Sequence, residues 1–154
     1  MQNKLISNLR NIDGGENLAL GEKIGEAKGK YTGMRVKSIG PEGIRMESDF
    51  VSENKGFGRF PSGRNMGTLE IINTPNGIST GTGQGMFTTP DGDSIVWKCS
   101  TLGKNAEGKT KSVIIVHFMT TSPKFSWMNS FFMVSEGISD MMTMEFTETD
   151  YEWK

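Results

Sequence analysis

The feature that most constrains this fold is a run of three glycines at every second position, Gly81, Gly83 and Gly85. Clustered glycines are typical of a loop that wraps a phosphate group, or of a strand with one bare face. A dinucleotide-binding loop has the spacing G-x-G-x-x-G and opens a helix. Here the third glycine comes one residue early, Pro90 follows in a turn, and no Gly-Lys-Ser/Thr of a Walker A loop follows the glycine run, which continues "GQGMFT". The sequence therefore favours the strand.

Because strand side chains alternate between two faces, the three glycines leave one face of this strand without side chains. A bare face lets a strand bend sharply, or lets a ring pack close to the backbone, and small barrels use this to close. Phe87 and Trp97 lie nearby in the sequence. We therefore predict a barrel hairpin in which aromatic rings cover the glycine row.

Turn signals recur along the rest of the chain. Segments of about 8 to 14 residues, rich in Thr, Ile, Val, Phe and Trp, separate them, which predicts an antiparallel all-β domain. The only helical signal is weak, a short turn beginning at Ser126. We expect residues 1–17 to form an arm or irregular first segment and residues 18–154 to form one domain. The turn signals lie at Gly40–Gly43, Pro61–Gly63, Thr74–Gly77, Thr89–Asp93, Gly103–Lys109 and Thr121–Pro123.

Three longer stretches resemble a group of small, uncharacterised prokaryotic proteins similar to the allene oxide cyclase and dirigent-like (calycin-like) barrels. They are "GISTGTGQGMFTTPDGDSIVWKCSTLG", "TTSPKFSWMNSFFMVSEG" and "TDYEWK". The resemblance covers roughly residues 25–154. It implies a closed or nearly closed antiparallel barrel of about eight strands in up-and-down order, often trimeric, with an apolar or aromatic ligand inside. No cyclase catalytic residue maps onto this chain, so none is carried over.

The interior of an eight-stranded barrel holds side chains or one small ligand. Residues 111–121 are apolar on both strand faces, so one face lines the interior and the other needs a second subunit or a helix to cover it. Carboxylates that face the interior would be candidate general bases, because burial raises a carboxyl pKa. The residues predicted to line the ligand space are Trp97, Cys99, His117, Met119, Met46, Phe50, Glu70 and Glu145.

His117 is the only histidine and Cys99 the only cysteine. His117 is either a hydrogen-bonded core or interface residue or a catalytic base. Cys99 is expected to be a buried, inert thiol. One histidine and one cysteine without paired spacing predict no metal site, and we expect no cofactor.

Charge and cysteine content narrow the function classes. The 17 basic and 18 acidic residues give a net charge of -1, which favours neither nucleic acid nor an anionic membrane as partner. The single cysteine, and the lack of a signal-like or membrane-spanning apolar run, predict a cytoplasmic protein.

Three functions fit the sequence. The first is a barrel that binds a small apolar or aromatic molecule in its interior. The second is an isomerase or cyclase on the same barrel, with His117, Glu70 or Glu145 as general base. The third is a structural homo-oligomer, a dimer or trimer, without a ligand.

Overall fold

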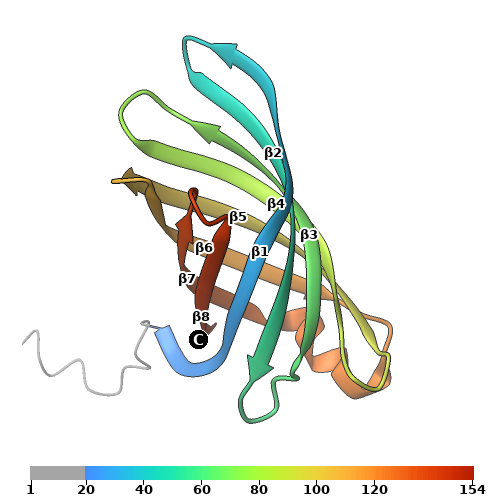
Figure 1. Cartoon of the computed structure of the whole chain (residues 1–154). Coiled ribbons are helices and arrows are strands. Elements are labelled where there is room, and N and C mark those ends of the chain that lie inside the picture. Colours follow the sequence, from blue (N-terminus) through green and yellow to red (C-terminus); the bar gives the residue numbers. More distant parts are fainter. Residues whose placement is uncertain (1–19) are drawn as a thin grey trace, which may run out of the picture.

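The structure is a computed structural model that describes residues 20–154, so the predicted arm at residues 1–17 lies outside the described residues. Each strand pairs antiparallel with the next, and the last pairs with the first, which closes the barrel (Figure 1). The predicted fold is confirmed: a closed, up-and-down, eight-stranded barrel with one short 3-10 helix. The elements are β1 Leu20–Gly40, β2 Gly43–Gly56, β3 Gly63–Asn73, β4 Ile78–Thr88, β5 Ser94–Ala106, β6 Lys109–Met119, η1 Pro123–Ser130, β7 Phe132–Asp140 and β8 Glu145–Trp153.

The tight turns form where glycine supplies a backbone conformation that other residues rarely adopt. Gly77 in the β3–β4 turn has φ 79°, and Gly92 in the β4–β5 turn has φ 89°. Both follow a Thr-Pro-Asn or Thr-Pro-Asp sequence, in which proline presets the preceding turn position. These turns fix the register of β4 between its two neighbours.

The glycine row of β4 faces the barrel interior. Gly85 lies opposite Gly67 of β3 and opposite Trp97 of β5. A Cβ atom added at Gly67 would lie 2.6 Å from the Trp97 ring, and one added at Gly85 would also collide with that ring. At Gly83 an added Cβ would lie 2.9 Å from Cys99 Sγ. The bare strand face therefore leaves room for the side chains of β5, as the alternating glycines predict.

Aromatic side chains fill one end of the barrel, which we call the closed end. The β2–β3 turn and η1 lie there, and the rings of Phe60, Phe118 and Phe131 pack with centroids 5.9 to 6.3 Å apart. The Arg59 guanidinium lies over the Trp127 ring at 4.1 Å from its centroid. Figure 1 shows η1, in orange, against this end of the strands. These rings shut one route into the interior.

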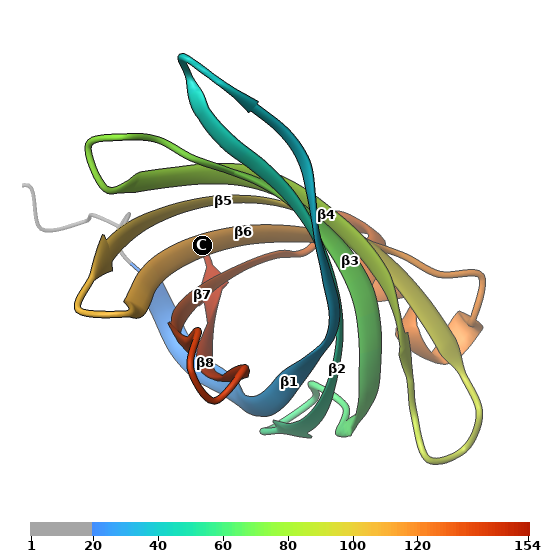
Figure 2. The same cartoon turned by 45° about the horizontal axis from the view of Figure 1, so that its top comes forward.

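The opposite end, which we call the open end, carries the β1–β2 hairpin. β8 pairs with β1 only from Leu20 to Lys30, so the rest of β1 extends past β8 with β2 as its only strand neighbour. Figures 1 and 2 both show this hairpin projecting beyond the barrel. Val36 and Ile39 near its tip are 56% and 77% exposed. The barrel is therefore asymmetric, with one aromatic-filled end and one apolar rim.

Candidate functional site

Two adjoining spaces lie inside the barrel. The inner space, toward the closed end, has a volume of about 70 Å³, and the outer space, toward the open end, about 100 Å³. Together they follow the axis of the barrel and give it a hollow interior. The side chains that line both spaces are Tyr31, Leu69, Ile114, Phe146 and Glu148.

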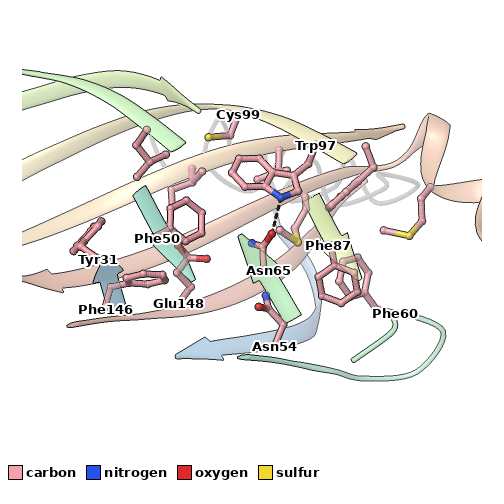
Figure 3. Close-up of a pocket in the computed structure, with 16 residues that line it drawn as sticks. Tyr31, Phe50, Asn54, Phe60, Asn65, Phe87, Trp97, Cys99, Phe146 and Glu148 are labelled. Atoms are coloured by element: carbon pink, nitrogen blue, oxygen red, sulfur yellow. Dashed lines mark hydrogen bonds between the residues drawn. The ribbon is translucent and has the colours of Figure 1, made fainter. Parts of the chain in front are cut away.

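Aromatic rings make up most of the wall of the inner space (Figure 3). Phe50 stands at the centre of this wall, with its ring centroid 5.9 Å from that of Trp97 and 5.5 Å from that of Phe146. The Phe50 and Phe146 rings meet edge to face, which is a favoured aromatic geometry. These contacts hold the rings in fixed positions around the space.

The indole nitrogen of Trp97 is already satisfied inside the barrel. Trp97 Nε1 donates a hydrogen bond to Asn65 Oδ1 at 2.7 Å, drawn as the dashed line in Figure 3. Asn54, also in this wall, accepts a hydrogen bond from Ser52 Oγ at 2.8 Å. Because its N–H is paired, the buried Trp97 side chain leaves no unsatisfied donor and presents an apolar ring face to the space.

Glu148 is the acidic side chain of the interior. It lines both spaces and is half-buried, so the part of its surface that is exposed faces the two spaces. Its carboxyl has no hydrogen-bond or ion-pair partner within residues 20–154, and neither wall contains a lysine, arginine or histidine. Burial, reinforced by the nearby Asp150 carboxylate, raises the pKa of Glu148 to about 8. At neutral pH this carboxyl is therefore mostly protonated and can donate a hydrogen bond.

Burial also raises the pKa values of three groups near Glu148. Burial raises the pKa of Asp150, although the carboxyl accepts a hydrogen bond from Ser135 Oγ at 2.5 Å. Burial raises the pKa of Tyr31, whose hydroxyl lies 3.0 Å from Ser139 Oγ. Burial, followed by the charge of Glu148, raises the pKa of Cys99 to about 12. The Cys99 thiol is therefore neutral at pH 7 and is a poor nucleophile.

Four of the predicted site residues lie on the interior walls. Trp97, Cys99 and Phe50 line the inner space, and Met46 lines the outer one. They come together because β2 and β5 are bent around the same glycine-rich strands, β3 and β4. Their contact with a ligand stays a prediction.

The other four lie outside the barrel, which corrects the expected inward orientation. His117 and Met119 are exposed on β6, because Val116 and Phe118 pair with the interior residues of β5 and take the inward face. Glu70 Oε1 accepts a hydrogen bond from Arg45 Nη1 at 2.6 Å on the outer face. Glu145 is exposed, because the next residue along β8 points inward.

The sequence prediction missed Glu148, although the pattern contained a signal for it. In β8, Phe146, Glu148 and Asp150 occupy alternate positions and share the inward face. A buried aromatic residue at position 146 therefore places both carboxyl groups in the interior. The signal was obscured because Tyr151 and Trp153, on the opposite face, also have large rings.

Solved structures share this barrel. A protein of unknown function from Clostridium acetobutylicum ATCC 824 is 16% identical, with a TM-score of 0.74 over 86% of this chain and 98% of that one. A β-barrel-like protein from Acinetobacter baumannii AYE is 18% identical, with a TM-score of 0.72 over 88% of this chain and 96% of that one. An enzyme from Penicillium herquei is 17% identical, with a TM-score of 0.65 over 90% of this chain and 98% of that one. At these identities the likeness shows the fold alone.

No protein-family description and no curated protein matches the chain. The expected likeness to small β-barrel proteins of unknown function is confirmed for the fold. The finer resemblance to allene oxide cyclase and dirigent-like barrels stays a prediction.

Residues 20–154 contain no group of three or more His, Cys, Asp or Glu side chains placed to hold a metal ion. They also contain no helix long and apolar enough to cross a membrane.

Proposed function

We propose that this protein binds a small apolar or aromatic molecule inside its barrel. The observation that carries the proposal is the pair of adjoining interior spaces: the inner one has a mainly aromatic and aliphatic wall, and the outer one mixes apolar side chains with serine, threonine and asparagine. An engineered apolar cavity of about 150 Å³ binds benzene, so spaces of this combined size suit a ligand with one aromatic ring. The ligand would enter by the open end, because the rings of Phe60, Phe118 and Phe131 block the other.

A substitution that fills the interior tests the proposal. Ile114 lines both spaces, and its neighbour Ile115 is exposed on the outer face of the same strand. We expect ethylbenzene to bind the wild-type protein and Ile114→Phe to abolish this binding, whereas Ile115→Phe leaves it unchanged. Isothermal titration calorimetry measures the three affinities, and intrinsic tryptophan fluorescence, to which Trp97 in the inner wall contributes, reports occupancy independently. Equal binding to all three proteins would place the ligand outside the barrel and contradict the proposal.

A second candidate is an isomerase or cyclase on the same barrel, with Glu148 in the role that the sequence assigned to His117, Glu70 or Glu145. One observation favours it: an unpaired interior carboxyl whose pKa of about 8 suits proton transfer near neutral pH. The test is exchange of the methyl protons of acetophenone in D₂O, followed by NMR. This candidate predicts faster exchange with the wild-type protein than with Glu148→Gln, and an equal rate with both would exclude it.

A further inference from the structure

Glu148 differs from the other polar side chains that line the inner space. Asn65 and Asn54 each accept a hydrogen bond from a neighbouring side chain, and the Tyr31 hydroxyl pairs with Ser139. Glu148 has no such partner within residues 20–154, and it lies where the inner and outer spaces adjoin. Figure 3 shows it among the aromatic side chains that surround the inner space. A carboxyl that has no protein partner and lies beside a mainly aromatic space is free to hydrogen-bond a molecule bound there.

The groups around Glu148 decide what that partner is. The titratable side chains that face it are Asp150 on its own strand, Tyr31 on β1 and Cys99 on β5. β7, on the other side of β8, places Gly137 opposite Glu148 and contributes no titratable group to either wall. All of these neighbours are acidic or neutral, so no cation holds Glu148 in its charged form. The group that faces the ligand is therefore a neutral carboxylic acid, with one O–H to donate.

We propose that the ligand carries a hydrogen-bond acceptor, such as a ketone or ester carbonyl, and that the Glu148 carboxyl donates to it where the two spaces meet. This inference rests on the proposed function and adds the chemical class of the ligand. An anionic ligand is disfavoured, because neither wall offers a positive charge. A cationic amine would require an ion pair buried among aromatic rings, which is costly to desolvate.

Three compounds of one skeleton separate these classes: acetophenone, ethylbenzene and 1-phenylethylamine. Calorimetry at pH 6 and at pH 9.5 compares their affinities for the wild-type protein. We expect acetophenone to bind roughly three- to tenfold more tightly than ethylbenzene at pH 6, the factor that one hydrogen bond contributes. The advantage disappears at pH 9.5, because the ionised carboxyl no longer donates. The Tyr31 and Cys99 groups stay neutral over this range, since their pKa values are raised.

Two variants of Glu148 assign the effect to this side chain. Glu148→Gln retains an N–H donor of similar shape that does not titrate, so the acetophenone advantage should persist at pH 9.5. Glu148→Met lacks a donor and should bind acetophenone and ethylbenzene alike at both pH values. Glu145→Gln, an exposed change on the same strand, should behave as the wild-type protein does.

The outcomes separate the acceptor proposal from the proposed function. Equal affinity for acetophenone and ethylbenzene at pH 6 overturns the acceptor proposal and leaves interior binding in place. Preference for 1-phenylethylamine overturns it in favour of a cationic ligand. If none of the three compounds binds, the proposed function and the acceptor proposal both fail.

Discussion

The indole ring of Trp97 lies against the bare α-carbon of Gly85, on the interior face of the barrel. The two residues are paired in register between β4 and β5, and no Cβ atom fits at Gly85 without meeting the ring. Gly67 of β3, next in register, supports the same ring. A missing side chain on one strand thus makes room for a large one on its neighbour, and the remaining space forms the cavity.

Gly85→Val is expected to destabilise the protein strongly. The added side chain would collide with the Trp97 ring and with the Met66 carbonyl, and overpacking of this kind costs about 1–3 kcal/mol or more. Urea denaturation measures the free energy of unfolding. Gln84→Val, one residue away and on the outer face, is the control and should change stability by less than about 0.5 kcal/mol. Equal effects of the two changes would show that the glycine row is not required.

Glu148 should make the protein less stable as the pH rises from about 4.5 to about 8. Its pKa is raised from 4.5 in the unfolded chain to about 8 in the fold, so the native state binds more protons across that window and loses stability as they leave. The loss is on the order of 5 kcal/mol. Glu148→Gln should remove the part of the pH dependence that Glu148 causes, and it should be more stable than the wild-type protein at pH 9.

Denaturant midpoints measured every half pH unit test this expectation, with Glu145→Gln as the exposed control on the same strand. Burial raises the pKa of Asp150 too, so Asp150 also lowers the stability of the protein as the pH rises. Some decrease of stability with pH should therefore persist in Glu148→Gln. Parallel curves for Glu148→Gln and the wild-type protein would mean that Glu148 is solvated and ionised in the native state.

The Cys99 thiol should resist modification while the protein is folded. It is buried, and its pKa of about 12 leaves almost no thiolate at pH 8. Iodoacetamide labelling followed by mass spectrometry should therefore be slow in buffer and fast in denaturant. Rapid labelling of the folded protein would identify an open route to the inner space that the present account lacks.

An apolar row on the outer surface predicts self-association. Met66, Met86, Val96 and Met119 are cross-strand neighbours on β3 to β6, and each is at least 38% exposed. Exposed apolar rows of this kind mark interaction sites, so we predict a homo-oligomer in which this row is buried. Sedimentation velocity should detect the oligomer, and Val96→Lys should dissociate it.

Ser94→Lys is the matched control for this row, since Ser94 is exposed at the end of the same strand. It should leave the oligomer intact. A monomeric wild-type protein at concentrations near 100 times those used for calorimetry would overturn the prediction.

The sequence predicted the barrel because its signals are local. Turn residues and the alternation of Gly81, Gly83 and Gly85 determine strand ends and the bare face without knowledge of distant contacts. The orientation of β6 was not predictable in the same way. Ile115 and Val116 are equally apolar, and only the pairing of β6 with β5 decides which of them points inward. Glu148 was missed for a related reason, since the burial of a carboxyl depends on barrel closure between β8 and β1.

The most direct test of the account is a crystal structure of the protein soaked with acetophenone. We predict electron density for the ring in the inner space, beside Phe50 and Trp97, with the carbonyl oxygen within hydrogen-bond distance of Glu148. An interior without ligand, together with a molecule bound on the outer surface, would contradict it.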